Sequence, residues 1–370
     1  MKNIPALTGI RFVAAFIVFF SHYPLEQLAK PIFPFAEQGY SGVTLFFVLS
    51  GFIICINYFD RFNADFLHEL PHFFVARFAR LYPLYCITVL YDWFAQKRHL
   101  NPVPHLLAIQ SWYPDIGVSM GINGPTWSVS VELFLYLFFP ILVLYASIAH
   151  LEKSRVRLFI TGILIVLVMY VLAQYYSSPS FNALPLADTN SSHRWLYRNP
   201  ATRVFDFLLG GLAGIWYLKH FSVRRENPAR IWSLITYAAL IAIVAVMSST
   251  KLFYSAFSWD FAIALPGLLL IVGLACNPNT QISRFLSCRL MVTLGELSYA
   301  FYLIHVPMRF LYKGVTGNAL NDITNFFFFL FLVILLAYSL HKLLELPLRK
   351  RIMHVYSTWH PSKDNKMTNA

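Results

Sequence analysis

The sequence predicts an all-α integral membrane protein, a bundle of about ten transmembrane helices with both termini in the cytoplasm. Hydrophobic residues make up 58% of the 370 residues and charged residues only 12%, whereas a soluble domain carries about 25% charged residues. Apolar stretches of roughly 20 residues, the length that crosses a bilayer, recur along most of the chain. We expect one transmembrane domain over residues 1–348, followed by a short basic cytoplasmic tail over residues 349–370.

The expected spans follow one another with short polar connections. They cover residues 6–23, 40–59, 73–95, 127–146, 157–175, 203–219, 231–248, 260–276, 291–312 and 324–345. With a cytoplasmic N-terminus, the inner segments hold about twice as many Lys and Arg residues as the outer loops, which agrees with the positive-inside rule. The net charge of +12 then reflects this asymmetry and attraction to anionic lipids. Basic residues scattered over short loops argue against nucleic-acid binding.

The first span carries the most informative pair of residues, Arg11 and His22. Eleven residues at 3.6 per turn make almost three turns, so both side chains lie on one helix face, about 16 Å apart. A charge near the middle of a membrane helix costs roughly 2.5–3.5 kcal/mol, and such charges usually have a function. The internal arginine also argues against a cleaved signal peptide. The pair predicts a reaction site inside the membrane.

Small residues open the second span, among them Ser41 and Gly42. They allow two helices to approach closely, or a slender ligand to enter between them. Close packing is the stronger interpretation from the sequence alone.

Two arginines, Arg77 and Arg80, stand at the inner end of the third span. Residues three apart share a helix face, and two guanidinium groups side by side bind phosphate well. Ordinary positive-inside anchoring explains the pair equally well.

The fourth span begins with Trp127 and Ser128 and carries Glu132 one turn later. A tryptophan at this depth is typical of an interfacial anchor, whereas a buried glutamate requires a partner or a reaction. With the expected topology, His22, Glu132, Asp206 and His305 lie at similar depth near the outer face. They either converge on a cavity or are wetted singly at helix ends, and for Asp206 we favour wetting.

Two outer loops, residues 96–126 and 176–202, are candidates for recognising an acceptor. Their aromatic residues Trp112, Tyr113, Trp195 and Tyr197 are suited to stacking on sugar rings, and equally to an interfacial belt. The four cysteines have no spacing typical of a disulfide framework or a metal site.

Six segments in order resemble the acyltransferase 3 family of integral membrane acyltransferases, which modify cell-envelope glycans. They are Leu7–Ala15 with His22, Gly42–Phe52, the pair Arg77 and Arg80, Trp127–Glu132, Gly295–His305 and Glu345–Pro347. The likeness spans residues 7–347. Thr8 and Glu296 each stand where the family usually has Asp, and Thr8 removes a carboxylate near Arg11.

The resemblance implies a bacterial inner-membrane enzyme that moves an acetyl or other short acyl group from cytoplasmic acyl-CoA to a sugar hydroxyl outside. No bound cofactor is expected. His22 is then the general base and Arg11 a donor-binding or charge-stabilising group, with Glu132 or His305 in support. The expected donor-binding residues are Arg77, Arg80, Ser41 and Gly42, and the expected acceptor-binding or supporting residues are Trp127, Ser128, Ser298, Tyr299, Tyr302 and His305.

Other functions remain open from the residues alone. A transporter or flippase would use the same intramembrane charges as a substrate pathway, although no inverted repeat is visible in the sequence. A membrane sensor without catalysis would not need His22. Because no Gly-x-Ser-x-Gly elbow is present, we favour direct transfer over an acyl-serine intermediate.

Overall fold

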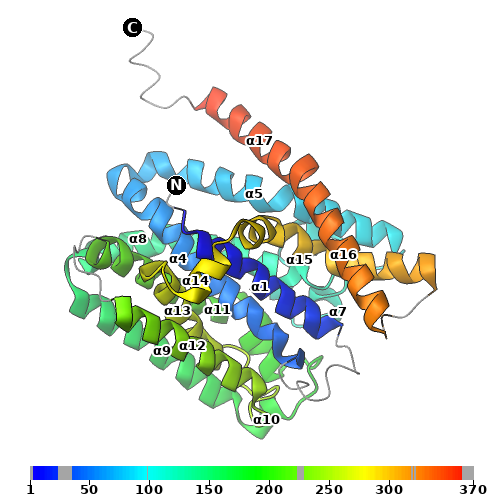
Figure 1. Cartoon of the computed structure of the whole chain (residues 1–370), viewed down its shortest axis with the longest axis horizontal. Helices are drawn as coiled ribbons and strands as arrows, with labels where there is room; N and C mark the ends of the chain where they lie inside the picture. The colour runs from blue at the N-terminus through cyan, green and yellow to red at the C-terminus, as the bar shows by residue number, and fades with distance from the viewer. Residues whose placement is uncertain are drawn as a thin grey trace.

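The computed structural model describes residues 3–23, 36–97, 99–222, 229–317, 320 and 322–360, and these residues form helices and loops with no strand. This confirms the all-α prediction (Figure 1). The long helices are α1 (Pro5–His22), α4 (Ser41–Ala64), α5 (Phe66–Ala95), α8 (Thr126–Ile148), α9 (Arg155–Tyr176), α11 (Pro200–Trp216), α12 (Ala229–Ser248), α13 (Phe261–Cys276), α15 (Arg289–Thr316), α16 (Ile323–Leu340) and α17 (Leu346–Trp359).

Short helical turns fill the connections between the long helices. The α-helical ones are α6 (Val103–Leu106), α7 (Ile116–Ser119), α10 (Pro179–Asn182) and α14 (Gln281–Leu286). The tighter 3₁₀ turns are η1 (Gln38–Tyr40), η2 (Gln110–Trp112) and η3 (Leu151–Lys153), and the wider π-helical turns are η4 (His193–Arg198), η5 (Tyr217–Phe221) and η6 (His341–Glu345).

Polar caps set several helix starts. The side chain of Asp65 accepts a hydrogen bond from the backbone amide of His68, so α5 begins about seven residues before the predicted 73. Asn199 caps α11 in the same way, and Pro200 occupies the first helical position, where its missing N–H costs nothing.

Eight helical segments in the described part of the chain are long and apolar enough to cross a membrane. The α11 and α13 helices, which coincide with two further predicted spans, have only 17 and 16 residues. The polytopic helical bundle is therefore confirmed, and the count of ten and the cytoplasmic termini stay predictions. The helix α17 covers residues 346–359, so it begins just before the expected tail and continues into it. Residues 361–370 lie outside the described part.

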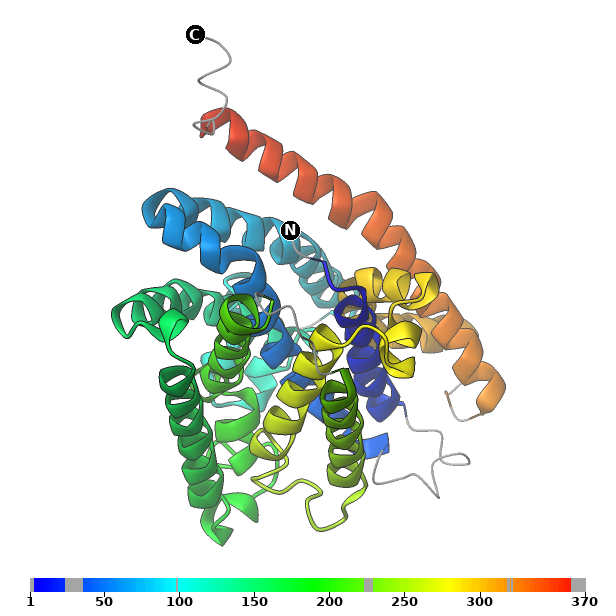
Figure 2. The ribbon, with the colours of Figure 1, turned by 60° about the vertical axis from the view of Figure 1, so that its left-hand side comes forward.

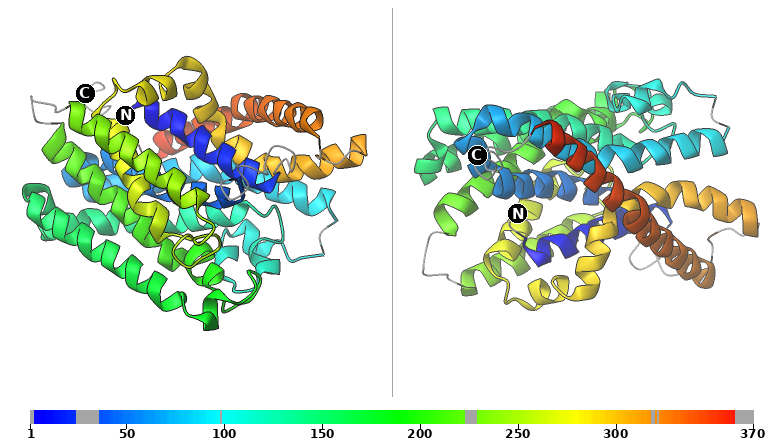
Figure 3. Two further views of the ribbon diagram at one scale, coloured as in Figure 1. Left: turned by 60° about the horizontal axis from the view of Figure 1, so that its bottom comes forward. Right: turned by 90° about the horizontal axis from the view of Figure 1, so that it is seen from above.

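The bundle is built around α4. In its most apolar window 78% of the residues are buried, against 17% for α9 and α12. The α9 and α16 helices lie at opposite edges of the bundle (Figure 3) and expose many apolar side chains. An apolar outer surface of this kind is what lipid tails solvate.

Glycines bring the central helices into direct contact. A Cβ on Gly210 of α11 would lie 2.0 Å from the carbonyl oxygen of Val48 on α4. A Cβ on Gly295 of α15 would lie 1.9 Å from the carbonyl oxygen of Thr8 on α1. Gly42 packs against α1 in the same way, so close helix approach, the stronger of the two interpretations, accounts for this residue.

A buried ion cluster joins α11 to the start of α13. Arg203 Nη1 lies 2.9 Å from Asp206 Oδ2 and 3.2 Å from Asp260 Oδ1. The Arg203 side chain also donates to the Trp259 carbonyl at 2.7 Å. Asp206 has no exposed surface, so its expected position as a wetted interfacial residue was wrong. Removing one partner of such a cluster leaves a buried charge uncompensated.

Gly210→Ala tests the close contact between α4 and α11. The added methyl group meets backbone rather than a flexible side chain, and overpacking of this kind destabilises by about 1–3 kcal/mol. We expect a lower midpoint of thermal unfolding for the protein purified in detergent. The control is Gly162→Ala on α9, where nothing lies within 4 Å of the new Cβ and helix propensity favours alanine. Equal midpoints for the two variants would contradict the packing.

Candidate active site

Two histidines from distant parts of the chain meet at one end of the bundle. His22 ends α1, and its Nδ1 lies 2.9 Å from Nε2 of His305 on α15. The two rings are nearly parallel, with an interplanar angle of 13°. The structure thus places His305, and not Glu132, beside His22.

Hydrogen bonds fix the proton positions on this pair. His305 Nδ1 lies 2.6 Å from the backbone oxygen of Tyr302, and a carbonyl oxygen only accepts, so this nitrogen carries the proton. His305 Nε2 then holds a lone pair and accepts a hydrogen bond from Nδ1–H of His22. The remaining ring nitrogen of His22, Nε2, is left unprotonated in the neutral pair, which is the state that a general base requires.

The surroundings hold His305 firmly and leave His22 open. His305 is buried and Tyr23 Oη donates to its backbone oxygen at 2.9 Å. The ring of Phe19 packs edge-on against His305. His22 is exposed. The pair therefore joins a buried, fixed histidine to one at the surface of the bundle.

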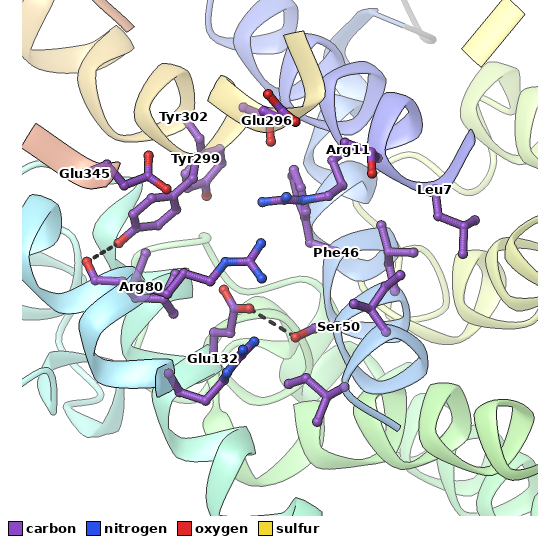
Figure 4. Close-up of a pocket in the computed structure, with 18 of the residues that line it drawn as sticks. Leu7, Arg11, Phe46, Ser50, Arg80, Glu132, Glu296, Tyr299, Tyr302 and Glu345 are labelled. Atoms are coloured by element: carbon purple, nitrogen blue, oxygen red, sulfur yellow. Dashed lines mark hydrogen bonds between the residues drawn. The ribbon is translucent and has the colours of Figure 1, made fainter. Parts of the chain in front are cut away.

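A cavity of about 730 Å³ enters the bundle between α1, α4, α5, α8, α15 and the turn η6. Of the predicted site residues, it is lined by Arg11, Arg77, Arg80, Ser128, Glu132, Ser298, Tyr299 and Tyr302. These residues come from four helices and lie far apart in the sequence. Figure 4 shows the guanidinium groups of Arg11 and Arg80 pointing into the same space, with Glu132 close to Arg80.

The charged side chains that line the cavity differ in whether they have hydrogen-bond partners. Glu132 accepts hydrogen bonds from Tyr136 Oη at 2.6 Å and Ser50 Oγ at 3.1 Å. No hydrogen bond or ion pair joins Arg11 or Arg80 to another residue in the described part of the chain. The nearby charges of Glu132 and Glu345 act on Arg11 through space, in place of the carboxylate that Thr8 removes. Two unpaired guanidinium groups make the cavity suited to an anion.

The cavity ends next to the histidine pair. The hydroxyl groups of Tyr302 and Ser128 lie 2.9 Å apart and both residues line the cavity. The Tyr302 ring is centred 5.8 Å from the His305 ring. The lining therefore comes within one aromatic ring of His305, although neither His22 nor His305 lines the cavity itself.

Several predicted residues lie elsewhere. Ser41 and Gly42 are buried in helix contacts and do not line the cavity. Trp127 is buried against Tyr197, with ring centres 4.6 Å apart. The interfacial anchor expected at Trp127 was wrong, and Tyr197 has no free ring face for stacking on a sugar. Trp112 of the other outer loop is exposed, and its role in acceptor recognition stays a prediction.

Among the cavity residues that the sequence did not mark as site residues are four from η6 and α17: His341, Lys342, Glu345 and Arg349. His341 Nδ1 lies 2.9 Å from Glu345 Oε2. The segment Glu345–Pro347 was the only signal in the sequence that pointed to this region, and it carried no role.

Cysteine labelling tests the boundary of the cavity. In a background without native cysteines, we expect Ser50→Cys to react with a water-soluble maleimide, because Ser50 lines the cavity. Ser41→Cys, on the same helix but 3% exposed, should stay unlabelled until the protein is denatured. Equal labelling of the two positions in folded protein would contradict the cavity as described.

Comparison with known proteins finds relatives that are named as acyltransferases. A family model described as an acyltransferase domain matches residues 4–342. Acyltransferase MdmB of Streptomyces mycarofaciens is 29% identical over 323 residues, which cover 82% of this chain and 78% of the relative. Peptidoglycan O-acetyltransferase OatA of Listeria monocytogenes is 25% identical over 83% of this chain, and a putative O-acetyltransferase of Staphylococcus aureus is 20% identical over 98% of it.

The chain spans 49% of the Listeria relative and 60% of the Staphylococcus relative, which are longer proteins. No solved structure matches the chain. The family match covers both histidines, the arginine pair and the segment Trp127–Glu132, and it confirms the resemblance drawn from the motifs. The chain therefore belongs to the acyltransferase 3 family.

Proposed function

We propose that this protein is a membrane O-acyltransferase that moves an acetyl or other short acyl group from cytoplasmic acyl-CoA to a hydroxyl of a sugar or polysaccharide outside the membrane. One observation carries the proposal. A cavity lined by Arg11, Arg77 and Arg80 is also lined by Tyr302, whose ring neighbours a histidine pair in which Nε2 of the exposed His22 is left unprotonated. Donor and acceptor then approach from opposite faces and meet at His22.

The proposed reaction is a direct transfer of the acyl group from the thioester to the acceptor hydroxyl. His22 Nε2 removes the proton from the acceptor hydroxyl while the oxygen attacks the thioester carbonyl carbon. The tetrahedral intermediate collapses to the ester as the carbon–sulfur bond breaks, and the thiolate takes the proton from His22. His305, through its bond to His22 Nδ1, stabilises the imidazolium that forms between the two events, as the acidic member of a catalytic triad does.

Of the hydroxyls of Tyr302 and Ser128, that of Tyr302 is suited to donating to the oxyanion, because Ser128 Oγ donates its proton to the backbone oxygen of Pro125 at 3.0 Å. Tyr302 lines the cavity beside the histidine pair, and positioned donors at a developing negative charge contribute strongly to acyl transfer. Arg11 is about 16 Å along α1 from His22, too far to touch the same carbonyl. We therefore assign Arg11 to the donor and not to the oxyanion.

The relatives support the class of substrate. One is named as a peptidoglycan O-acetyltransferase, which makes an envelope glycan the proposed acceptor here and a bacterial inner membrane the proposed location. A transporter or flippase is not favoured, because the family match and the relatives' names all describe acyl transfer.

The first test follows label from radioactive acetyl-CoA into envelope glycan, in membranes that hold equal amounts of each variant. We expect His22→Ala to lower the rate about 10²–10⁴-fold, the usual contribution of a general base. The control is His99→Ala, at an exposed loop position, which should match wild type. Label transfer that is unchanged in His22→Ala would remove His22 from the chemistry. No transfer by wild type would contradict the donor.

A second test addresses the role of His305. The amide oxygen of a glutamine can accept the hydrogen bond from His22 Nδ1–H, whereas alanine cannot. We expect His305→Gln to retain more activity than His305→Ala, with the loss in kcat and little change in KM for the donor. Equal activity of the two variants, or a loss confined to KM, would contradict a positioning role.

A further inference from the structure

One side of the cavity, next to α5, is formed by the last described part of the chain. The π-helical turn η6 and the start of α17 contribute His341, Lys342, Glu345 and Arg349 to the lining. The α17 helix packs along α5 and extends beyond the rest of the bundle (Figure 2). Helix α5 carries Arg77 and Arg80, so α17 faces the helix that holds the arginine pair.

Positive charge is concentrated at this end of the cavity. The charges of Arg77 and Arg80 both act on Arg349, although like charges repel and should separate unless something holds them. Five cationic side chains line the cavity against three carboxylates. One of these carboxylates, Glu345, is engaged by His341 at 2.9 Å, and another, Glu132, by Tyr136 and Ser50. The excess positive charge points to an anionic ligand.

Arg77 supplies a second, independent observation. Its side chain is 4% exposed, and its Nη2 donates to Tyr58 Oη at 3.0 Å. Its Nε is buried without a hydrogen-bond partner in the described structure. A buried guanidinium nitrogen without an acceptor is costly, and a phosphate oxygen placed between the arginines would satisfy it.

We propose that Arg349 completes a phosphate-binding site with Arg77 and Arg80, so that the C-terminal arm η6–α17 forms half of the site that holds the CoA nucleotide. This inference rests on the proposed function and extends it to a residue outside the arginine pair. Three guanidinium groups from two helices surround phosphate oxygens with paired donors. Lys342 adds a fourth positive charge to the same wall.

The geometry of α17 supplies a matched control. Arg351 follows two residues later, about 200° around the helix from Arg349, and it is exposed and absent from the cavity lining. The two arginines have the same charge and lie in the same helix. A general effect of net charge, or of attraction to the membrane, would appear equally in Arg349→Ala and Arg351→Ala.

The experiment measures binding of CoA and of pantetheine, which lacks the phosphates, to the full-length protein in neutral nanodiscs by isothermal titration calorimetry. We expect Arg349→Ala to weaken CoA binding about 10–100-fold, the value of a charge-assisted hydrogen bond expressed as a ratio of affinities. Pantetheine affinity should be unchanged, Arg351→Ala should bind CoA as wild type does, and Arg349→Lys should fall between wild type and alanine.

Equal CoA affinity in Arg349→Ala and Arg351→Ala would overturn the proposal, as would an equal loss of CoA and pantetheine binding in Arg349→Ala. Failure of wild type to bind CoA would contradict the donor in the proposed function. In that case the phosphate site is tested by mass spectrometry of the anionic lipid that co-purifies with the protein. Loss of this lipid from Arg349→Ala, but not from Arg351→Ala, would support the site with a lipid headgroup as its ligand. Retention of the lipid in Arg349→Ala would overturn the site.

Discussion

The contact between α1 and α15 is the interaction on which the candidate site depends. Gly295 of α15 has no side chain, and a Cβ there would lie 1.9 Å from the carbonyl oxygen of Thr8 on α1; Gly9 of α1 makes a similar close approach to Leu286 of the neighbouring helix α14. The two helices run in the same direction, with Thr8 beside Gly295 and His22 beside His305. A shift of one residue would turn each histidine by about 100° and break the pair. Close packing of the two helices is thus the condition for the histidine pair.

Burial of charge is the second constraint. Arginine in a membrane is costly, and the chain reduces that cost in two different ways. Arg203 is neutralised by Asp206 and Asp260 in a closed, buried cluster, which fits a structural role. Arg11 and Arg80 face a cavity and have no such partner among the residues that the structure describes. A closed ion cluster thus marks the packed core of the bundle, whereas cations that face a cavity mark the candidate site.

Sequence patterns predicted the helices and most of the cavity. Hydropathy is averaged over a whole span, so it locates helices well. The motifs added site residues on four of the helices that line the cavity. Pairwise contacts between distant helices are a different matter. The choice of His305 over Glu132 as the partner of His22 depends on helix rotation, which no single span encodes. Trp127 and Tyr197 were misplaced because an amphipathic ring suits a lipid interface and a protein core equally well.

Arg349 was missed for a related reason. In the sequence it stands in a run of basic residues with Lys350 and Arg351, which resembles ordinary positive-inside anchoring. Only the path of η6 and α17 back along α5 singles it out. Of the three neighbouring basic residues, only Arg349 is turned toward the cavity by the helix, and we therefore assign it a different role.

The most direct test of the account is an electron cryo-microscopy structure with a non-hydrolysable acetyl-CoA analogue bound. We expect the phosphates between α5 and α17, with the acetyl carbonyl carbon within about 6 Å of His22 Nε2, the reach of one hydrogen bond plus one near-attack contact. A carbonyl carbon that stops beside Arg11, about 16 Å away along α1, would contradict the account.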